Sequence, residues 1–140
     1  MSDGNKKLRV ILVDDHPAVL RQTIQLLPER FEIVEVCEDG LGLEAASAEL
    51  KPDVIVMDIT LPVYSGMDLA RRLREAGSTA KIVFLTVHAD RDYASEAFEI
   101  GALGYVIKQR LALDLVPAID AAVAGTRFIS PCPELSDTLN

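Results

Sequence analysis

The sequence predicts an α/β fold in which helices cover both faces of a parallel β-sheet. Short apolar runs rich in β-branched residues alternate with segments of helical periodicity. Four of the five apolar runs are almost continuously apolar, which is typical of strands that are buried on both faces. The length of 140 residues suits one domain with its own hydrophobic core.

The expected strands are short and evenly spread along the chain. They are Leu8–Val13, Ile33–Cys37, Val54–Met57, Ile82–Val87 and Tyr105–Ile107. The second run, EIVEVCED, alternates apolar and polar residues, so it suits a strand at the edge of the sheet.

A helix is expected after each strand, because apolar or small residues recur there at helical spacing. Pro17 fits the first turn of the first helix, and the fifth helix should end before Gly125. Pro117 removes a backbone donor within the fifth pattern, so that helix should begin near Val116 or be kinked. The five patterns are Leu20, Ile24 and Leu27; Leu43, Ala46 and Leu50; Leu69, Leu73 and Ala76; Ala94, Ala97 and Gly101; and Val116, Ile119 and Val123.

Five strands that alternate with five helices imply right-handed crossovers between parallel strands. We therefore expect a flavodoxin-like (βα)5 doubly wound sheet with strand order 2-1-3-4-5. Residues 1–7 are expected to form a flexible N-terminus, and residues 8–125 the domain. Residues 126–140, which include Pro131 and Pro133, should form an irregular tail or the start of a linker.

Composition excludes several classes of protein. The net charge of −8 argues against nucleic-acid binding by this segment, although aspartates gathered at a site contribute to that charge. No apolar stretch approaches a membrane span, and the start MSDGNKK does not resemble a secretory signal. Cys37 and Cys132 form neither a disulfide framework nor a metal motif, which favours a reduced, cytoplasmic setting.

Polar residues stand at the carboxyl ends of four predicted strands. Asp14 and Asp15 follow the first strand, Asp58 follows the third, Thr86 lies at the end of the fourth and Lys108 follows the fifth. In a parallel sheet these ends lie on one edge, so the sequence predicts that the five side chains converge.

Three neighbouring carboxylates raise one another's pKa unless a cation intervenes. Mg²⁺ suits oxygen ligands of this kind. We expect Asp15 and Asp58 to bind Mg²⁺ directly, Asp14 to bind it through water, and the backbone carbonyl of Thr60 to complete the set. Asp58 is also the expected nucleophile toward a phosphoryl group, because carboxylates form acyl phosphates and Mg²⁺ neutralises the developing charge.

The other two residues suit contacts with the phosphoryl oxygens, Lys108 as a point charge and Thr86 through its hydroxyl group. Each residue also has a simpler interpretation. Asp14 and Asp15 could cap the first helix, Asp58 could be a turn residue, Thr86 an ordinary strand residue and Lys108 a solvated strand end. The ordered combination of all five favours the phosphoryl-accepting site.

The chain resembles the receiver domains of two-component response regulators from Leu8 to about Ile129. The motifs that carry the resemblance are VDDHP, MDITLPVYSG, LTVHAD and GYVIK, in this order and each at a strand end. VDDHP and the closing AAVAGTRFISP resemble the NarL/FixJ subfamily, in which a LuxR-type helix-turn-helix domain usually follows the receiver.

The resemblance implies that a sensor histidine kinase donates the phosphoryl group to Asp58. Thr86 would then move toward the phosphoryl group and Tyr105 would turn inward, which would change the surface of the fourth helix, fifth strand and fifth helix. Thr60 and His88, which lie two residues beyond Asp58 and Thr86, would modulate hydrolysis of the acyl phosphate.

Three further residues are less clearly defined by the pattern. Tyr105 could equally be an ordinary half-buried aromatic residue. His16 is expected to be structural or exposed. Gln109 follows Lys108 where many receivers carry proline, so the resemblance does not carry over the cis bond often found there.

We therefore expect a phosphorylatable switch that catalyses only its own phosphorylation and dephosphorylation, and that is not an enzyme for an outside substrate. The expected output is transcription regulation by a longer parent protein, through a DNA-binding domain beyond this segment. Phosphorylation could also cause homodimerisation through helix four, strand five and helix five, or through helices one and five. No membrane partner is expected.

Other functions remain as alternatives. A stand-alone receiver would act by protein–protein interaction. A phosphatase of the haloacid-dehalogenase type is disfavoured, because Thr60 stands where that family needs a second aspartate. A flavodoxin is disfavoured because VDDHP is acidic where a flavin phosphate needs a cradle rich in Ser, Thr and Gly.

Overall fold

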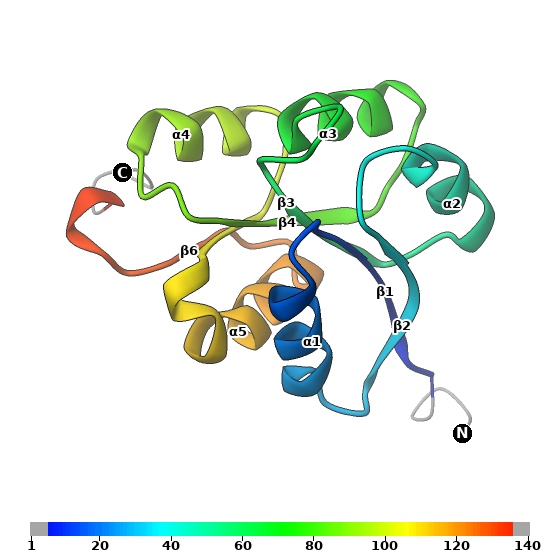
Figure 1. The fold of residues 1–140 in the computed structure, drawn as a ribbon, viewed down its shortest axis with the longest axis horizontal. Coiled ribbons are helices and arrows are strands. Elements are labelled where there is room, and N and C mark those ends of the chain that lie inside the picture. Colours follow the sequence, from blue (N-terminus) through cyan, green and yellow to red (C-terminus); the bar gives the residue numbers. More distant parts are fainter. Residues whose placement is uncertain (1–5, 136–140) are drawn as a thin grey trace.

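A single parallel sheet organises the chain, and the computed structural model describes residues 6–135 of it (Figure 1). The strand order within these residues is β2-β1-β3-β4-β5-β6. The predicted order 2-1-3-4-5 is confirmed, and β6 extends the sheet beyond β5. The strands are β1 (Leu8–Val13), β2 (Phe31–Cys37), β3 (Val54–Asp58), β4 (Lys81–Thr86), β5 (Gly104–Ile107) and β6 (Phe128–Ile129).

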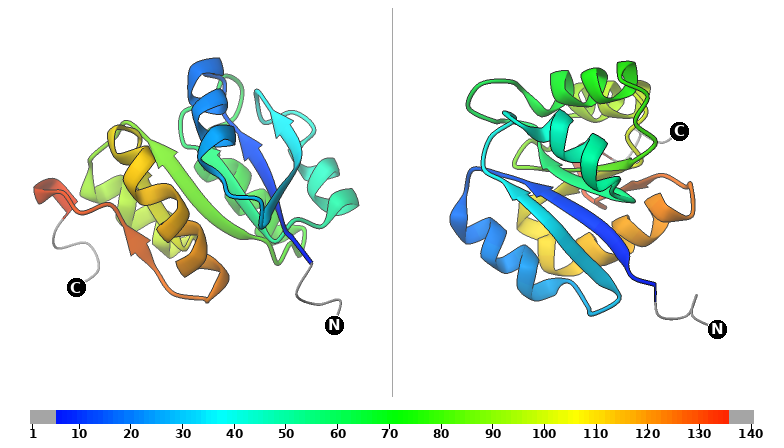
Figure 2. Two further views of the ribbon diagram at one scale, coloured as in Figure 1. Left: turned by 90° about the horizontal axis from the view of Figure 1, so that it is seen from below. Right: turned by 90° about the vertical axis from the view of Figure 1, so that its right-hand side faces the viewer.

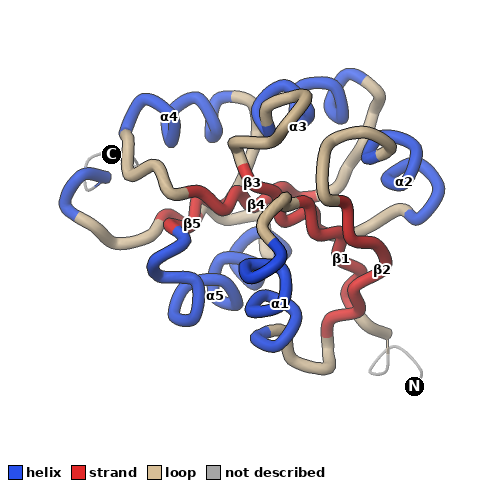
Figure 3. The backbone as a smooth tube through the Cα atoms, in the orientation of Figure 1, coloured by secondary structure: helices blue, strands red, loops and turns tan. Residues whose placement is uncertain are grey.

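Two layers of helices enclose the sheet. Helices α2, α3 and α4 cover one face, whereas α1 and α5 cover the other (Figures 1 and 2). The tube in Figure 3 shows helices alternating with strands along the chain, and every pair of neighbouring strands is parallel. The bounds are α1 (Pro17–Leu26), α2 (Leu43–Leu50), α3 (Gly66–Glu75), α4 (Arg91–Glu99) and α5 (Leu111–Val123), with 3-10 turns η2 (Lys108–Arg110) and η3 (Pro133–Leu135).

The core is divided in two by the sheet, because successive side chains of a strand point to opposite faces. Ile11 and Ile55 belong to the cluster under α2, α3 and α4. Val10 and Val54, one residue earlier in each strand, belong to the cluster under α1 and α5. This double burial explains the continuous apolar runs, and the partial exposure of β2 at the sheet edge explains its alternation.

The ends of the helices follow the local sequence. The Ser65 hydroxyl caps α3 by accepting a hydrogen bond from the Asp68 amide, and the Asp90 carboxylate caps α4. Helix α5 ends before Gly125, which has a φ of 82°. This helix runs from Leu111 through Pro117, so the predicted alternative of a start near Val116 is wrong.

The segment after α5 is more regular than the sequence suggests. Residues 126–135 contain β6 and η3, where an irregular tail was expected. Phe128 pairs with Gly104 and Ile129 with Tyr105. Leu135 is only 1% exposed. A two-residue strand and a single buried leucine are too short to produce a recognisable period, so neither could be predicted from the sequence pattern.

The first five residues of the expected flexible N-terminus lie outside the described part of the chain. Among residues 6–135, no helix is both long enough and apolar enough to cross a bilayer.

Candidate functional site

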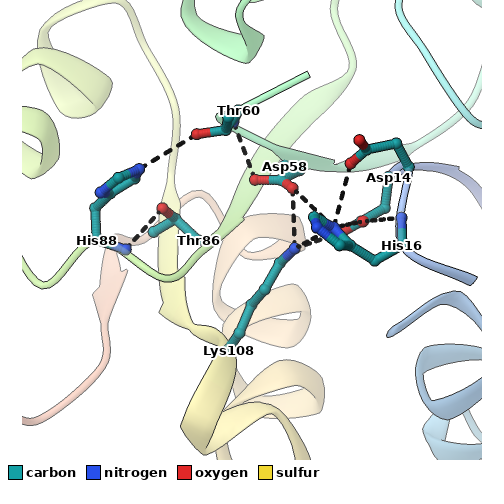
Figure 4. A network of polar contacts seen from close by, with 8 residues as sticks. Asp14, His16, Asp58, Thr60, Thr86, His88 and Lys108 are labelled. Atoms are coloured by element: carbon teal, nitrogen blue, oxygen red, sulfur yellow. Dashed lines mark hydrogen bonds and ion pairs between the residues drawn. The ribbon is translucent and has the colours of Figure 1, made fainter. Parts of the chain in front are cut away.

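The carboxyl edge of the sheet brings the predicted acidic and basic residues together (Figure 4). Asp58 is the last residue of β3, Asp14 directly follows β1, and Lys108 directly follows β5. The Lys108 Nζ atom lies 2.9 Å from Asp58 Oδ2 and 3.0 Å from Asp14 Oδ2. The predicted convergence of these three residues is therefore present in the structure.

Burial dominates the electrostatics of the phosphoacceptor candidate. Asp58 is 3% exposed, and this burial raises the pKa of its carboxyl group. Hydrogen bonds from Lys108 and from the Thr60 amide lower the same pKa but do not offset the burial. Burial alone would lower the pKa of Lys108, but its hydrogen bonds to Asp58 and Asp14 outweigh that effect and raise it.

A cation can be held beside these carboxylates. Asp14, Asp15, His16 and Asp58 each offer one ligand atom, and these atoms lie within 4.8 Å of one another. Three of the four donors are carboxylate oxygens, the donor type that Mg²⁺ prefers. The Thr60 amide donates to Asp58 Oδ1 at 3.0 Å and so fixes the orientation of that carboxylate. The donor set therefore fits Mg²⁺.

His16 reaches the site as well, which the sequence did not predict. Its Nδ1 atom lies 2.8 Å from Asp14 Oδ1, 3.2 Å from Asp15 Oδ1 and 3.2 Å from Lys108 Nζ. The ring is partly exposed, as expected, but its nitrogen faces the carboxylates. The sequence does contain one feature that could have predicted this contact: His16 lies between the aspartates and Pro17, the first residue of α1.

Thr86 and His88 lie on the neighbouring side of the site, where β4 leads into the loop before α4. Thr86 is fully buried, and its Oγ1 atom accepts a hydrogen bond from the His88 amide at 3.0 Å. The His88 Nε2 atom lies 3.2 Å from Thr60 Oγ1 (Figure 4). The His88 ring also packs on the Tyr93 ring, with centroids 4.9 Å apart, a contact that strand-end patterns do not reveal.

Tyr105 already points into the protein, so the expected turn from an outward to an inward position does not match the structure. Its side chain is fully buried, and its hydroxyl group donates to the His88 backbone oxygen at 2.6 Å. Burial also raises the pKa of the Tyr105 phenol. The alternative of a half-buried aromatic residue is therefore wrong, and the sequence did not predict β6, which pairs with Tyr105 through Ile129. The described residues contain no cis peptide bond, so the bond between Lys108 and Gln109 is trans.

Gly66 allows α3 to begin directly against β3, the strand that ends at Asp58. A Cβ atom at this position would lie 2.3 Å from the Asp58 backbone oxygen and 3.0 Å from the Ile59 Cα atom. The Gly66 amide donates to the Ile59 backbone oxygen at 2.7 Å. Glycine is needed here for close approach of two backbones.

Comparison with known proteins gives a consistent result. Residues 10–120 match the model of the response regulator receiver domain. The uncharacterized transcriptional regulatory protein YxjL of Bacillus subtilis is 36% identical over 137 residues, which are 94% of this chain and 63% of the relative. The chain spans between about half and two thirds of the length of such curated relatives.

Solved structures show the same fold. A two-component response regulator of the LuxR family from Aurantimonas sp. SI85-9A1 has a TM-score of 0.84 at 38% identity, covering 90% of this chain and 91% of that one. The response regulator RcsB in complex with DNA has a TM-score of 0.81 at 25% identity, covering 96% of this chain and 68% of that one. With the site geometry and the family match, these similarities show that the chain belongs to the response regulator receiver domain family.

Proposed function

We propose that this chain accepts a phosphoryl group on Asp58 from a sensor histidine kinase, with Mg²⁺ as cofactor. The observation that carries the proposal is the contact between Lys108 Nζ and Asp58 Oδ2 at 2.9 Å, with Asp14 and Asp15 beside it. This arrangement combines a nucleophilic carboxylate, a fixed positive charge and oxygen ligands for a cation.

The transfer can be written with the residues in place. An Asp58 carboxylate oxygen attacks phosphorus, the bond between phosphorus and the donor's imidazole nitrogen breaks, and that nitrogen keeps the electron pair and takes up a proton. Lys108 can pass its hydrogen bond from Asp58 to a phosphoryl oxygen. Asp15, Asp58 and the Thr60 carbonyl would hold Mg²⁺ directly, and Asp14 through water. The ion supplies charge neutralisation to the transferring oxygens.

The switch is proposed to centre on Thr86 and Tyr105. Both residues contact the backbone of His88, at its amide and at its carbonyl group respectively. If the Thr86 hydroxyl moves to a phosphoryl oxygen, the His88 amide loses its acceptor. The loop before α4 would then adjust, and the surface near α4 and β5 with it. Thr60 and His88 are proposed to modulate hydrolysis of the acyl phosphate.

The output is proposed to be control of transcription by a longer protein. Relatives of this chain are named transcriptional regulators, and the RcsB relative has been solved with DNA. DNA would be bound by a domain beyond this segment, since the segment itself carries a net charge of −8. Homodimerisation on phosphorylation, a cytoplasmic setting and the absence of turnover of an outside substrate belong to the same proposal.

Intact-mass spectrometry after incubation with acetyl phosphate tests the phosphorylation step. One phosphoryl adduct should form only with Mg²⁺, and it should be lost in Asp58→Asn. Asp92→Asn, at an exposed position in the first turn of α4, serves as the matched control and should keep the adduct. An adduct that persists in Asp58→Asn would contradict the assignment of the phosphoacceptor.

A second assay separates the switch from a phosphatase. The protein is incubated with a phosphate ester and the released phosphate is followed over many equivalents. We expect no turnover beyond one equivalent of protein. Sustained turnover that depends on Asp58 would favour the phosphatase alternative.

A further inference from the structure

We propose that the segment Phe128–Leu135 is an intramolecular ligand of the α4–β5 edge, that Ser130 and Asp114 form its latch, and that partners reach this edge only after the segment leaves. That the segment occupies this edge follows from its contacts in the structure. The coupling of release to phosphorylation rests on the proposed function.

Backbone hydrogen bonds attach the segment to β5. The Phe128 amide donates to the Leu103 oxygen at 2.8 Å, and the Ser130 amide donates to the Tyr105 oxygen at 2.9 Å. β6 therefore satisfies the outer edge of β5, and that edge is closed to another strand while the segment is in place.

The latch is a buried polar network between the segment and α5. The Ser130 hydroxyl donates to Asp114 Oδ2 at 2.7 Å and accepts from the Ile107 amide at 2.9 Å. Arg110 Nε also donates to Asp114 Oδ2, at 2.7 Å. Ser130 is 1% exposed and Asp114 4% exposed. Loss of the serine hydroxyl therefore leaves the Ile107 amide without its acceptor and leaves Asp114 with Arg110 alone.

Apolar contacts attach the other end of the segment to the α4 side of the core. Leu135 is buried in the same cluster as Phe98 of α4, with Ile129 and Cys132 packed against it. The Arg127 guanidinium group stacks over the Phe98 ring at 5.2 Å. Beyond β6, the rest of the segment runs past the edge of the sheet that α4 and α5 flank. It is drawn as the red end of the ribbon in Figures 1 and 2.

The segment also contacts the proposed switch directly. Tyr105 pairs with Ile129 in the sheet, and its backbone oxygen accepts the Ser130 amide. The hydroxyl group of the same tyrosine holds the His88 carbonyl. A shift of the loop before α4 can therefore be transmitted to the segment through Tyr105. The segment in turn leads toward the C-terminal end of the chain.

Thiol labelling of Cys132 measures departure of the segment, since Cys132 lies between β6 and η3 and is half-buried. Peptide mass spectrometry separates it from Cys37, which is half-buried in β2 at the opposite edge of the sheet and reports opening away from the segment. Ser130→Ala and Leu135→Ala should each speed labelling of Cys132 at least about fivefold, the effect of one lost buried interaction. Cys37 should not change.

Two matched variants serve as controls. Ser95→Ala alters an exposed serine of α4, and Leu113→Ala an exposed leucine of α5. Both should leave the labelling of Cys132 unchanged. Unchanged labelling of Cys132 in both latch variants would overturn the latch. A parallel rise at Cys37 would overturn it too, because the variants would then act by global destabilisation.

The release step is tested on the wild-type protein with beryllofluoride and Mg²⁺. Binding of beryllofluoride is followed by fluorine NMR, separately from labelling. If it binds and labelling of Cys132 rises while that of Cys37 does not, the release step is supported. Binding without any rise at Cys132 overturns the release step alone. Failure of beryllofluoride to bind would contradict the proposed function and with it the release step, and the latch variants would still decide whether the edge is occupied.

Discussion

The Tyr105 hydroxyl group donates to the backbone oxygen of His88 at 2.6 Å, although the two residues lie 17 positions apart in sequence. Thr86 accepts from the amide of the same histidine. Two strands therefore fix the two backbone groups of one loop residue. The His88 side chain also contacts Thr60, whose amide donates to Asp58, so the loop before α4 is tied to the site at several points.

The contact between Thr60 and His88 should be measurable as a coupling energy. Thr60→Val and His88→Phe keep approximate shape but remove the hydrogen bond. A double-mutant cycle on the free energy of unfolding should give a coupling of about 0.5 to 1 kcal/mol. Pairing His88→Phe with Thr79→Val, an exposed position before β4, should give additive effects. Additivity of the Thr60 pair would mean that the contact contributes nothing.

Loss of Lys108 should lower the free energy of unfolding and make that free energy depend on Mg²⁺. Lys108→Met leaves the buried Asp58 and Asp14 carboxylates without their cation, at a cost of about 3 kcal/mol in the free energy of unfolding. Saturating Mg²⁺ should recover part of that loss, because the ion neutralises the same carboxylates. Urea denaturation with and without Mg²⁺ measures this, and Lys7→Met at an exposed position should show neither effect.

The raised pKa of Asp58 implies a pH-dependent stability. The folded protein binds the Asp58 proton more tightly than the unfolded chain does, so the ionised group costs stability above its folded pKa. That cost disappears as the pH falls through the folded pKa. Asp58→Asn should therefore be more stable than the wild type at neutral pH. Lys108 keeps Asp14 as a partner in this variant.

Denaturation at a series of pH values tests this expectation. The stability difference between Asp58→Asn and wild type should narrow toward acidic pH, whereas Asp92→Asn should show no such trend. An Asp58→Asn protein that is less stable at neutral pH, or a difference that widens on acidification, would contradict burial as the dominant effect on this carboxyl group.

Gly66→Ala should disturb the site through its backbone. The added methyl group meets the Asp58 oxygen at 2.3 Å, so β3 or α3 must shift, at a cost of about 2 kcal/mol or more. Beryllofluoride affinity should fall together with stability. Gly77→Ala is the contrasting variant, since Gly77 has a φ of 87° and open space around it. It should lose about 1 kcal/mol of stability and keep its beryllofluoride affinity.

The sequence predicted most of the fold and the centre of the site for one physical reason. Strands covered on both faces produce continuous apolar runs, and the polar residue after each run marks the same edge of a parallel sheet. Asp14, Asp58 and Lys108 could therefore be brought together without knowledge of any distance.

The features that were not predicted depend on side-chain direction or on very short elements. His16 is the N-cap of α1, and its amide donates to Asp14 Oδ1. The direction in which its ring then points, toward the carboxylates, is not encoded in a sequence pattern. The stacking of Tyr93 on His88 joins a helix to a loop. β6 has two residues, which are too few for a helical or a strand period of apolar residues to be recognised.

The sixth strand also bears on how safely this domain can be shortened. A chain cut after Gly125 would lose β6, leave the outer hydrogen-bonding groups of β5 unpaired and remove Leu135 from the core. Bare strand edges of this kind act as templates for pairing between molecules, and so for aggregation. Residues 128–135 are therefore expected to protect the domain from such pairing, and a cut placed beyond Leu135 should preserve that protection.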